Sequence, residues 1–146
     1  MRELGDISGA ANVIRLAVAP VFLLTAVGAF LGVMTSRLGR VIDRARVLEA
    51  RLEASPPETA QATRDHLNVL SRRARLINIA ITACTVTALL ICAVIAILFF
   101  GSYLDIDTTT TVSLIFILSM LVLMTGLLCF LQEVFLATLS LRIGPK

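Results

Sequence analysis

Three long stretches without a charged residue constrain the fold of this 146-residue chain more than any other feature. Residues 16–36 form a run of 21 such positions, residues 76–104 a run of 29 and residues 108–132 a run of 25. An α-helix needs about 20 apolar residues to cross about 30 Å of hydrocarbon. All three runs are long enough, so the sequence predicts an all-α membrane protein with three transmembrane helices.

The composition points to the same class of protein. Hydrophobic residues make up 58% of the chain and charged residues 16%, whereas soluble domains have about 45–50% and about 25%. These values exclude a disordered chain, a collagen-like chain and a disulfide scaffold. The first uncharged run is longer than the roughly 7–15 apolar residues of a secretory signal, and no A-x-A cleavage site follows it. We therefore expect that it is retained as a transmembrane helix.

Most charged residues lie between the first two uncharged runs. Residues 37–75 contain nine arginines and five acidic residues, a net charge of +4, whereas the loop 101–111 contains no basic residue. Because Lys and Arg are enriched in short cytoplasmic loops, the charges predict an outside N-terminus and a cytoplasmic C-terminus. Within a single membrane domain (1–146), the expected order is span 1 at about 13–36, a cytoplasmic hairpin at 37–75, span 2 at about 76–100, an outer loop at 101–111, span 3 at about 112–136 and a cytoplasmic tail at 137–146.

Two amphipathic patterns predict that the cytoplasmic segment is an antiparallel helical hairpin. Each has apolar residues at steps of three and four, as on one face of an α-helix. No helix breaker follows span 1, and Ser55 and Glu58 have the spacing of a capping box before the second pattern. The hairpin is expected to project from the membrane or, alternatively, to lie flat on anionic lipid. The two stripes are Leu38, Val41, Ile42, Ala45, Leu48 and Leu52, and Leu67, Leu70, Ala74 and Ile77.

Small residues recur every four positions in the first two spans. Such residues let membrane helices approach closely, so we expect these two faces to contact each other or one of them to form an oligomer interface. Pro20 removes one backbone hydrogen bond in span 1 and predicts a kink or, alternatively, a broken helix that lines a cavity. The small residues are Gly28, Gly32 and Ser36 in span 1, and Ala80, Cys84, Ala88, Cys92 and Ala96 in span 2.

Glu133 is the candidate intramembrane carboxylate. It follows the third uncharged run and, if Arg142 marks the interface, it lies about 13 Å deeper along the helix. An ionised side chain at that depth faces the protein interior or water. Thr125, Cys129, Glu133 and Ala137, all small or polar, form a stripe at steps of four. We expect Glu133 to point toward packed protein, in a structural ion pair or, alternatively, in proton or ion handling.

The expected partners of Glu133 are Arg37, Arg40 or Arg75, at the inner ends of the other spans. Together with their neighbours these residues predict a charged cytoplasmic collar. Its members are Arg37, Arg40, Asp43, Arg44, Arg46, Arg72, Arg73 and Arg75.

No motif in the sequence indicates an enzyme, a cofactor or a metal site. The three cysteines lack a C-x-x-C pair, and His66 is the only histidine. A nucleic-acid-binding module is not recognisable. Asp107 is expected to cap the third span, the alternative being a cation site with Asp105.

Residues 37–49, RLGRVIDRARVLE, resemble the R-L-x-R-x-x-D-R-x-R-x-L-E signature of the DUF2721 family of small bacterial membrane proteins. Residues 70–77, LSRRARLI, and residues 126–137, GLLCFLQEVFLA, are similar to further segments of the family. Members often have arginine at the position of Gln132. The resemblance extends from about residue 14 to 141 and implies a bacterial inner-membrane protein, without an established function. It places emphasis on Arg37, Arg40, Asp43, Arg44, Arg46, Arg72, Arg73 and Glu133.

The sequence favours a homo-oligomer that conducts or transports small ions, since three spans are too few to enclose a pathway alone. Glu133 would line its inner vestibule. The alternative is a non-conducting scaffold or regulatory subunit, whose Arg-rich hairpin binds a cytoplasmic protein or anionic lipid. If the two hairpin stripes fully bury each other, little apolar surface remains for a partner. The side chains that discriminate are Leu38, Val41, Leu48, Leu67 and Leu70.

Overall fold

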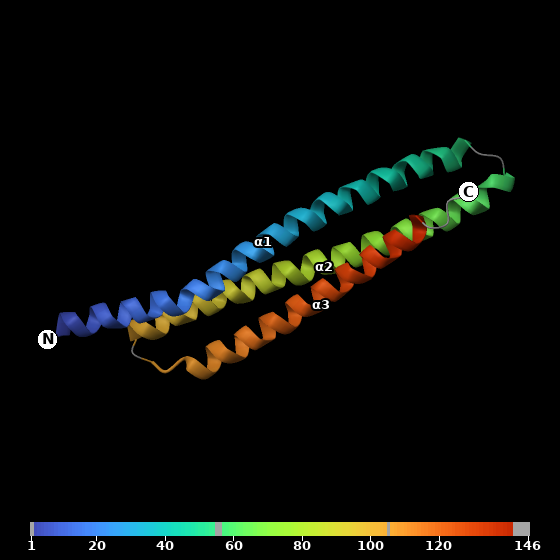
Figure 1. Ribbon diagram of the computed structural model, residues 1–146. Helices are drawn as coiled ribbons and strands as arrows, with labels where there is room; N and C mark the ends of the chain where they lie inside the picture. Colours follow the sequence, from blue (N-terminus) through green and yellow to red (C-terminus); the bar gives the residue numbers. More distant parts are fainter. Residues whose placement is uncertain (1, 55–56, 105, 142–146) are drawn as a thin grey trace. The chain divides into compact units, whose positions relative to one another are not determined.

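The computed structural model consists of three long helices, α1 (Arg2–Ala54), α2 (Pro57–Leu104) and α3 (Thr109–Leu141) (Figure 1). The structure describes residues 2–54, 57–104 and 106–141, and within these ranges every residue except 106–108 is helical. All three helices are long and apolar enough to cross a membrane. The prediction of an all-α chain with three potential membrane spans is confirmed.

The helices contribute to two compact units. Unit 1 comprises Met1–Phe30 and Ala83–Met124, and unit 2 comprises Leu31–Thr82 and Thr125–Lys146. Unit 2 contains both helices of the predicted hairpin, and each continues without interruption into the adjoining apolar segment. Ser55 of the predicted capping box lies outside the described residues, so this cap stays a prediction.

Pro20 lies inside α1, and its side chain is buried. The helix continues through it from Arg2 to Ala54. The alternative in which this proline breaks the first span is therefore not what the structure shows.

Burial recurs every seven residues along each helix. A seven-residue repeat, at 3.5 residues per turn, keeps one seam of a helix against its neighbours. The buried series are Pro20, Val27, Met34 and Val41 in α1, Leu70, Ile77, Cys84 and Ile91 together with Ala80, Thr87 and Val94 in α2, and Ser119, Gly126 and Glu133 in α3.

The small residues of α2 follow this seam only at its start. Ala80 and Cys84 are buried and Ala88 is half-buried, but Cys92 and Ala96 are exposed. A step of four residues turns the helix by about 400°, so the stripe drifts by about 40° per step. After four steps it lies on almost the opposite side of the helix. Within the chain, only the first half of this series is therefore a contact face, and an oligomer interface at its exposed second half stays a prediction.

The small residues of α1 lie on an exposed face of the helix. Gly28, Gly32 and Ser36 are exposed, and no heavy atom lies within 4 Å of a Cβ built on either glycine. Of the two predicted arrangements, contact with the α2 face is therefore not formed. An oligomer interface at this face stays a prediction.

The buried hydroxyl groups of unit 1 are hydrogen-bonded to backbone carbonyls. Thr87 donates to the carbonyl of Ala83 at 2.9 Å and lies 3.4 Å from that of Ser119, while Ser119 donates to the carbonyl of Phe116 at 2.7 Å. Both side chains have no exposed surface. A buried hydroxyl without a partner is costly, so these bonds allow two polar residues to occupy the seam.

The connection between α2 and α3 is shorter than the predicted loop 101–111, because both helices extend into it. Gly101 is buried against Thr108, whose Oγ1 would lie 2.6 Å from a Cβ at this glycine. The amide of Ile106 donates to the carbonyl of Gly101 at 3.1 Å. Asp107 Oδ1 accepts from the amide of Thr109 at 3.0 Å, which confirms the predicted cap of the third span.

We expect replacement of Asp107 by alanine to lower the melting temperature in detergent, because the first amide of α3 loses its acceptor. Hydrogen bonds from the hydroxyl and the amide of Thr109 hold the pKa of Asp107 below its ordinary value of 3.8. A lowered pKa stabilises the fold above pH 3.8, and this contribution is lost as the pH falls through the lowered pKa. Circular-dichroism melts should show a difference between wild type and Asp107→Ala at pH 7 that vanishes in strong acid. Asp107→Asn, which caps without titrating, should show no such pH dependence, and equal melting temperatures at pH 7 would contradict the cap.

Candidate functional site

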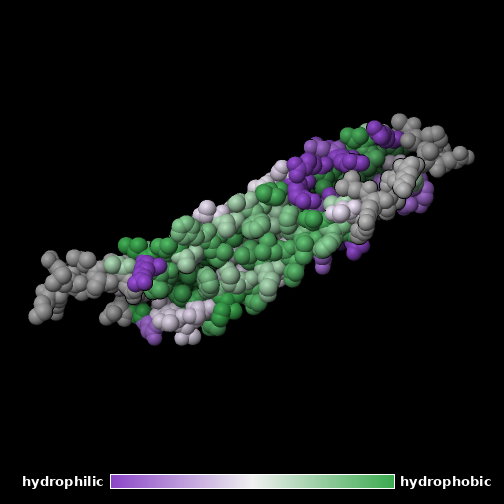
Figure 2. Space-filling model, in the orientation of Figure 1, coloured by the Kyte–Doolittle hydropathy of each residue, from purple (hydrophilic) through white to green (hydrophobic). Residues whose placement is uncertain are grey.

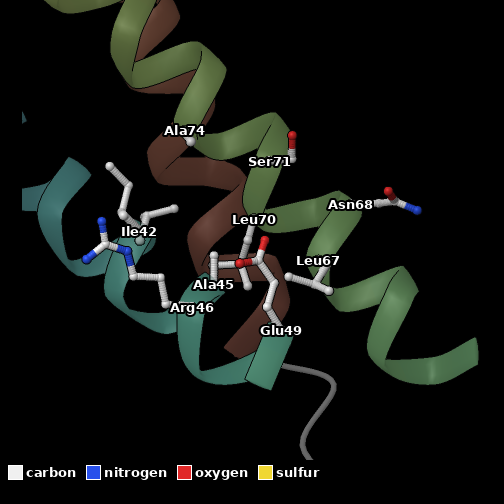
Figure 3. A pocket seen from close by; sticks show the side chains of 10 residues that line it. Ile42, Ala45, Arg46, Glu49, Leu67, Asn68, Leu70, Ser71 and Ala74 are labelled. Carbon is white, nitrogen blue, oxygen red and sulfur yellow. The ribbon is translucent and has the colours of Figure 1, made fainter. Parts of the chain in front are cut away.

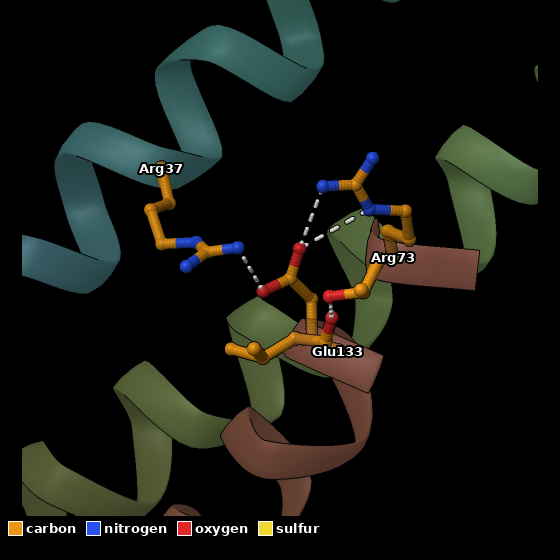
Figure 4. Close-up of polar contacts among 5 residues, drawn as sticks. Arg37, Arg73 and Glu133 are labelled. Atoms are coloured by element: carbon orange, nitrogen blue, oxygen red, sulfur yellow. Dashed lines mark hydrogen bonds and ion pairs between the residues drawn. The ribbon is translucent and has the colours of Figure 1, made fainter. Parts of the chain in front are cut away.

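The main candidate site of the chain is the carboxylate of Glu133, in unit 2, together with two arginines. The Glu133 side chain has no exposed surface. Arg73 of α2 donates to its Oε1 from Nε at 3.1 Å and from Nη2 at 2.9 Å. Arg37 of α1 places Nη2 3.1 Å from Oε2 (Figure 4). These three residues, here called the ion triad, join all three helices.

The two arginines hold the carboxylate differently. Arg73 forms two aligned hydrogen bonds to one oxygen, whereas the other oxygen, Oε2, accepts no aligned hydrogen bond among the described residues and interacts with Arg37 as an ion pair. The guanidinium carbon of Arg37 also lies 5.4 Å from the ring centroid of Phe130. A cation above an aromatic face is attracted by the ring. Arg37 is therefore held both by the carboxylate of Glu133 and by the ring of Phe130.

The seven-residue seams bring Arg73 and Glu133 together. Glu133 is the third member of the buried series of α3, after Ser119 and Gly126. Arg73 lies seven residues before Ala80, and so continues one of the α2 series toward the hairpin. It follows that these charged side chains occupy positions that are held by apolar, small or hydroxyl side chains elsewhere along the seam.

Burial makes the ion triad a structural necessity. Moving an isolated carboxylate out of water costs several kcal/mol even after relaxation, and a good ion pair with additional hydrogen bonds offsets that cost. Arg73 and Arg37 keep 18% and 27% of their side-chain surface exposed, so the cations are only partly desolvated. Two guanidinium groups around one carboxylate leave a net charge of +1, which disfavours binding of a metal cation at Glu133.

Of the three alternative partners predicted for Glu133, the structure shows one. Arg37 is a partner, as expected, but Arg40 instead lies with Nη1 3.5 Å from Ser36 Oγ, and Arg75 is exposed. The second partner, Arg73, was expected only as a member of the collar. The seven-residue series is the signal that could have identified Arg73. Residues seven apart follow the seam between the helices, whereas residues four apart do not.

The stripe of four predicted around Glu133 is not uniformly buried either. Thr125 is exposed, and Cys129 and Ala137 are half-buried. Arg142, the expected marker of the membrane interface, lies outside the described residues.

The other members of the predicted collar are exposed on the hairpin. Figure 2 shows hydrophilic side chains gathered over the hairpin in unit 2. These exposed members are Arg40, Asp43, Arg44, Arg46, Arg72 and Arg75.

The two apolar stripes of the hairpin pack against each other incompletely. Val41 and Leu70 are buried, whereas Leu38, Leu48 and Leu67 are half-buried. A groove of about 370 Å³ lies between the helices, with Ile42 and Ala45 of α1 facing Leu67 and Leu70 of α2 (Figure 3). Apolar surface therefore remains accessible beside the charged residues.

The sequence model of the family described as a protein of unknown function, DUF2721, matches residues 17–143. The chain belongs to this family. The match includes all three residues of the ion triad, so the DUF2721 region contains the whole candidate site. Comparison with curated proteins and with solved structures gives no significant match.

We expect the ion triad to dominate the stability of unit 2. Removing one partner of a buried ion pair costs about 3–5 kcal/mol, so Arg73→Met and Glu133→Gln should lower the free energy of unfolding by about this amount. Arg37→Met should cost less, because this guanidinium is more exposed and forms no aligned hydrogen bond. Denaturant titrations in detergent, followed by circular dichroism, would measure the three values.

Arg72→Met is the matched control, because Arg72 precedes Arg73 on α2 but is exposed. Its effect should stay within about 0.5 kcal/mol, as for most surface substitutions. An Arg73→Met variant as stable as Arg72→Met would contradict the assigned role of the ion triad.

Proposed function

We propose that this protein is a non-catalytic, non-conducting membrane scaffold or regulatory subunit that presents a basic helical hairpin to an anionic partner. The observation that carries the proposal is the state of Glu133, which has no exposed surface and is bound by two arginines. A carboxylate in a conduction pathway must meet water and exchange ions. Glu133 instead connects α3 to both helices of the hairpin, as expected of a structural anchor.

The charge distribution supports a cytoplasmic location for the hairpin. The nine arginines of residues 37–75 and the absence of basic residues from 101–111 favour an inner, or plasma, membrane with the N-terminus outside and the C-terminus in the cytoplasm. In this orientation the hairpin is available to partners at the inner membrane surface.

The surface of the hairpin supports an anionic partner. Arg40, Arg44, Arg46, Arg72 and Arg75 are exposed, and guanidinium groups recognise carboxylates and phosphates through paired hydrogen bonds. The incompletely closed groove between the apolar stripes adds accessible apolar surface beside these charges. An anionic lipid and an acidic protein both have the complementary charge.

Ion flux tests the non-conducting part of this proposal. Liposomes containing the full-length chain should release K⁺ or Cl⁻ no faster than empty liposomes, because Glu133 is sealed by its two arginines. Flotation would verify incorporation of the protein, and a K⁺ ionophore would verify that the trapped ions are detectable. Flux above the empty liposomes would contradict the proposal. In that case, unchanged flux with Glu133→Gln would remove this carboxylate from the pathway.

A homo-oligomer is the second candidate, and one observation favours it. Gly28 and Gly32 form an exposed, shallow face on α1 with no heavy atom within 4 Å of a built Cβ. Close approach of a second membrane helix suits such a face. Ion conduction, the function expected from the sequence alone, would require such an assembly of several subunits.

Subunit counting tests the oligomer. Native mass spectrometry of the protein in detergent should show more than one chain, and the double variant Gly28→Ile/Gly32→Ile should shift the population to monomers, because the added side chains fill the face. Val33→Ile is the control, since Val33 is exposed on another side of α1. A monomeric wild type, or an oligomer unaffected by the double variant, would contradict this interface.

A further inference from the structure

A cationic hollow lies beside the ion triad in unit 2. It consists of two adjoining cavities of about 420 Å³ and about 240 Å³. Arg37, Arg44, Leu70 and Arg73 line both cavities, while Arg40 lines only the smaller one. Four arginines thus line the hollow, three of them in both cavities.

The positive charge of the hollow exceeds what the chain neutralises. Glu133 is the carboxylate paired with Arg37 and Arg73, and no acidic side chain is among the residues that line either cavity. Four arginines against one carboxylate leave a local charge of +3. Arg44 forms no ion pair with any described residue, and Arg40 reaches only the hydroxyl of Ser36. Like charges at such density repel one another unless an anion binds among them.

The donors of these arginines suit a phosphate group. A guanidinium has five N–H donors in a planar fork that matches phosphate oxygens. The contacts to Glu133 use two nitrogens of Arg73 and one of Arg37. Figure 4 shows that each of these guanidinium groups also has a nitrogen directed away from the carboxylate.

The position of the hollow indicates where the phosphate comes from. Arg37 directly follows the first uncharged run, and Arg73 lies three residues before the start of the second run at residue 76. Both therefore stand at the same end of the spans, at the depth where lipid headgroups begin. The larger cavity also has apolar lining from Leu48, Val69 and Ala137. A phosphate attached to an acyl chain fits this combination better than a free phosphate.

We propose that this hollow binds a phosphate group, and that its apolar lining selects that group as the headgroup of an anionic phospholipid. Basic pockets between membrane helices on the cytoplasmic side bind such headgroups. The site rests on the proposed function, because it identifies the anionic partner of the hairpin. Arg44 and Arg40 are the residues that hold the ligand without also holding the fold.

Binding to the delipidated full-length chain in a neutral maltoside detergent tests the site. Dihexanoyl phosphatidylglycerol below its micelle concentration, dihexanoyl phosphatidylcholine and inorganic phosphate would each be titrated by thermal shift. Phosphatidylglycerol should stabilise the protein saturably and bind more tightly than the other two. Arg44→Gln should weaken it by about tenfold, since a charged hydrogen bond contributes about 1.5–3 kcal/mol and 1.4 kcal/mol is tenfold.

Arg72→Gln is the matched control, because it removes the same charge from an exposed arginine that lines neither cavity. If Arg44→Gln and Arg72→Gln weakened the binding of phosphatidylglycerol equally, the lipid would be attracted by charge alone and the proposed site would be wrong. The absence of saturable binding would also contradict the site. Equal affinity for inorganic phosphate would overturn the selection of lipid. Without ligand, Arg44→Gln should melt no lower than wild type, because this guanidinium forms no ion pair with a described residue and its removal relieves repulsion. The ion-flux experiment tests the proposed function independently of lipid binding. The two experiments together therefore distinguish a conducting protein that binds the lipid from a non-conducting protein that does not.

Discussion

The rest of unit 2 depends on neutralising one buried carboxylate. Glu133 has no contact with solvent, and a charge in that position is tolerated only when cations and hydrogen-bond donors replace water. Arg73 supplies two aligned donors and Arg37 supplies the opposing charge. Because these arginines come from α2 and α1, the carboxylate sets which residues of the two hairpin helices stand beside α3. An apolar contact would not specify the axial register so strictly.

The seven-residue repeat explains how three long helices bring these groups together. Buried positions in α1, α2 and α3 all recur at this interval, which is the spacing that keeps a seam between neighbouring helices. Most seam positions are apolar or small, but Thr87 and Ser119 are not, and their hydroxyls bond to backbone carbonyls. Polar groups in the seam are therefore compensated locally when they are neutral, and across helices when they are charged.

The features that depend on local sequence were predictable, and those that depend on helix faces were less so. The three apolar helices follow from runs of uncharged residues, and the cap follows from an aspartate, Asp107, two residues before the start of α3. Arg73 was not among the expected partners, because these were chosen by their place at the inner ends of the spans and not by helix face. A step of four residues, which defined the small-residue series, drifts by about 40° around the helix. The same drift exposes Cys92 and Ala96 at the end of the small-residue series. Contacts between distant helices depend on angles that accumulate over many turns.

The arginines beside the ion triad have two different roles: some neutralise Glu133, and the others are available to bind a ligand. One carboxylate needs one cation for neutrality, and Arg73 alone already gives it two hydrogen bonds. Arg37 completes the ion triad, so Arg40 and Arg44 are the arginines that exceed the structural requirement, and repulsion between them and the ion triad opposes folding of the hairpin base. A bound anion removes that repulsion and gains stability from the same charges. The arginines that are superfluous for packing are therefore the ones through which a ligand can stabilise the hairpin.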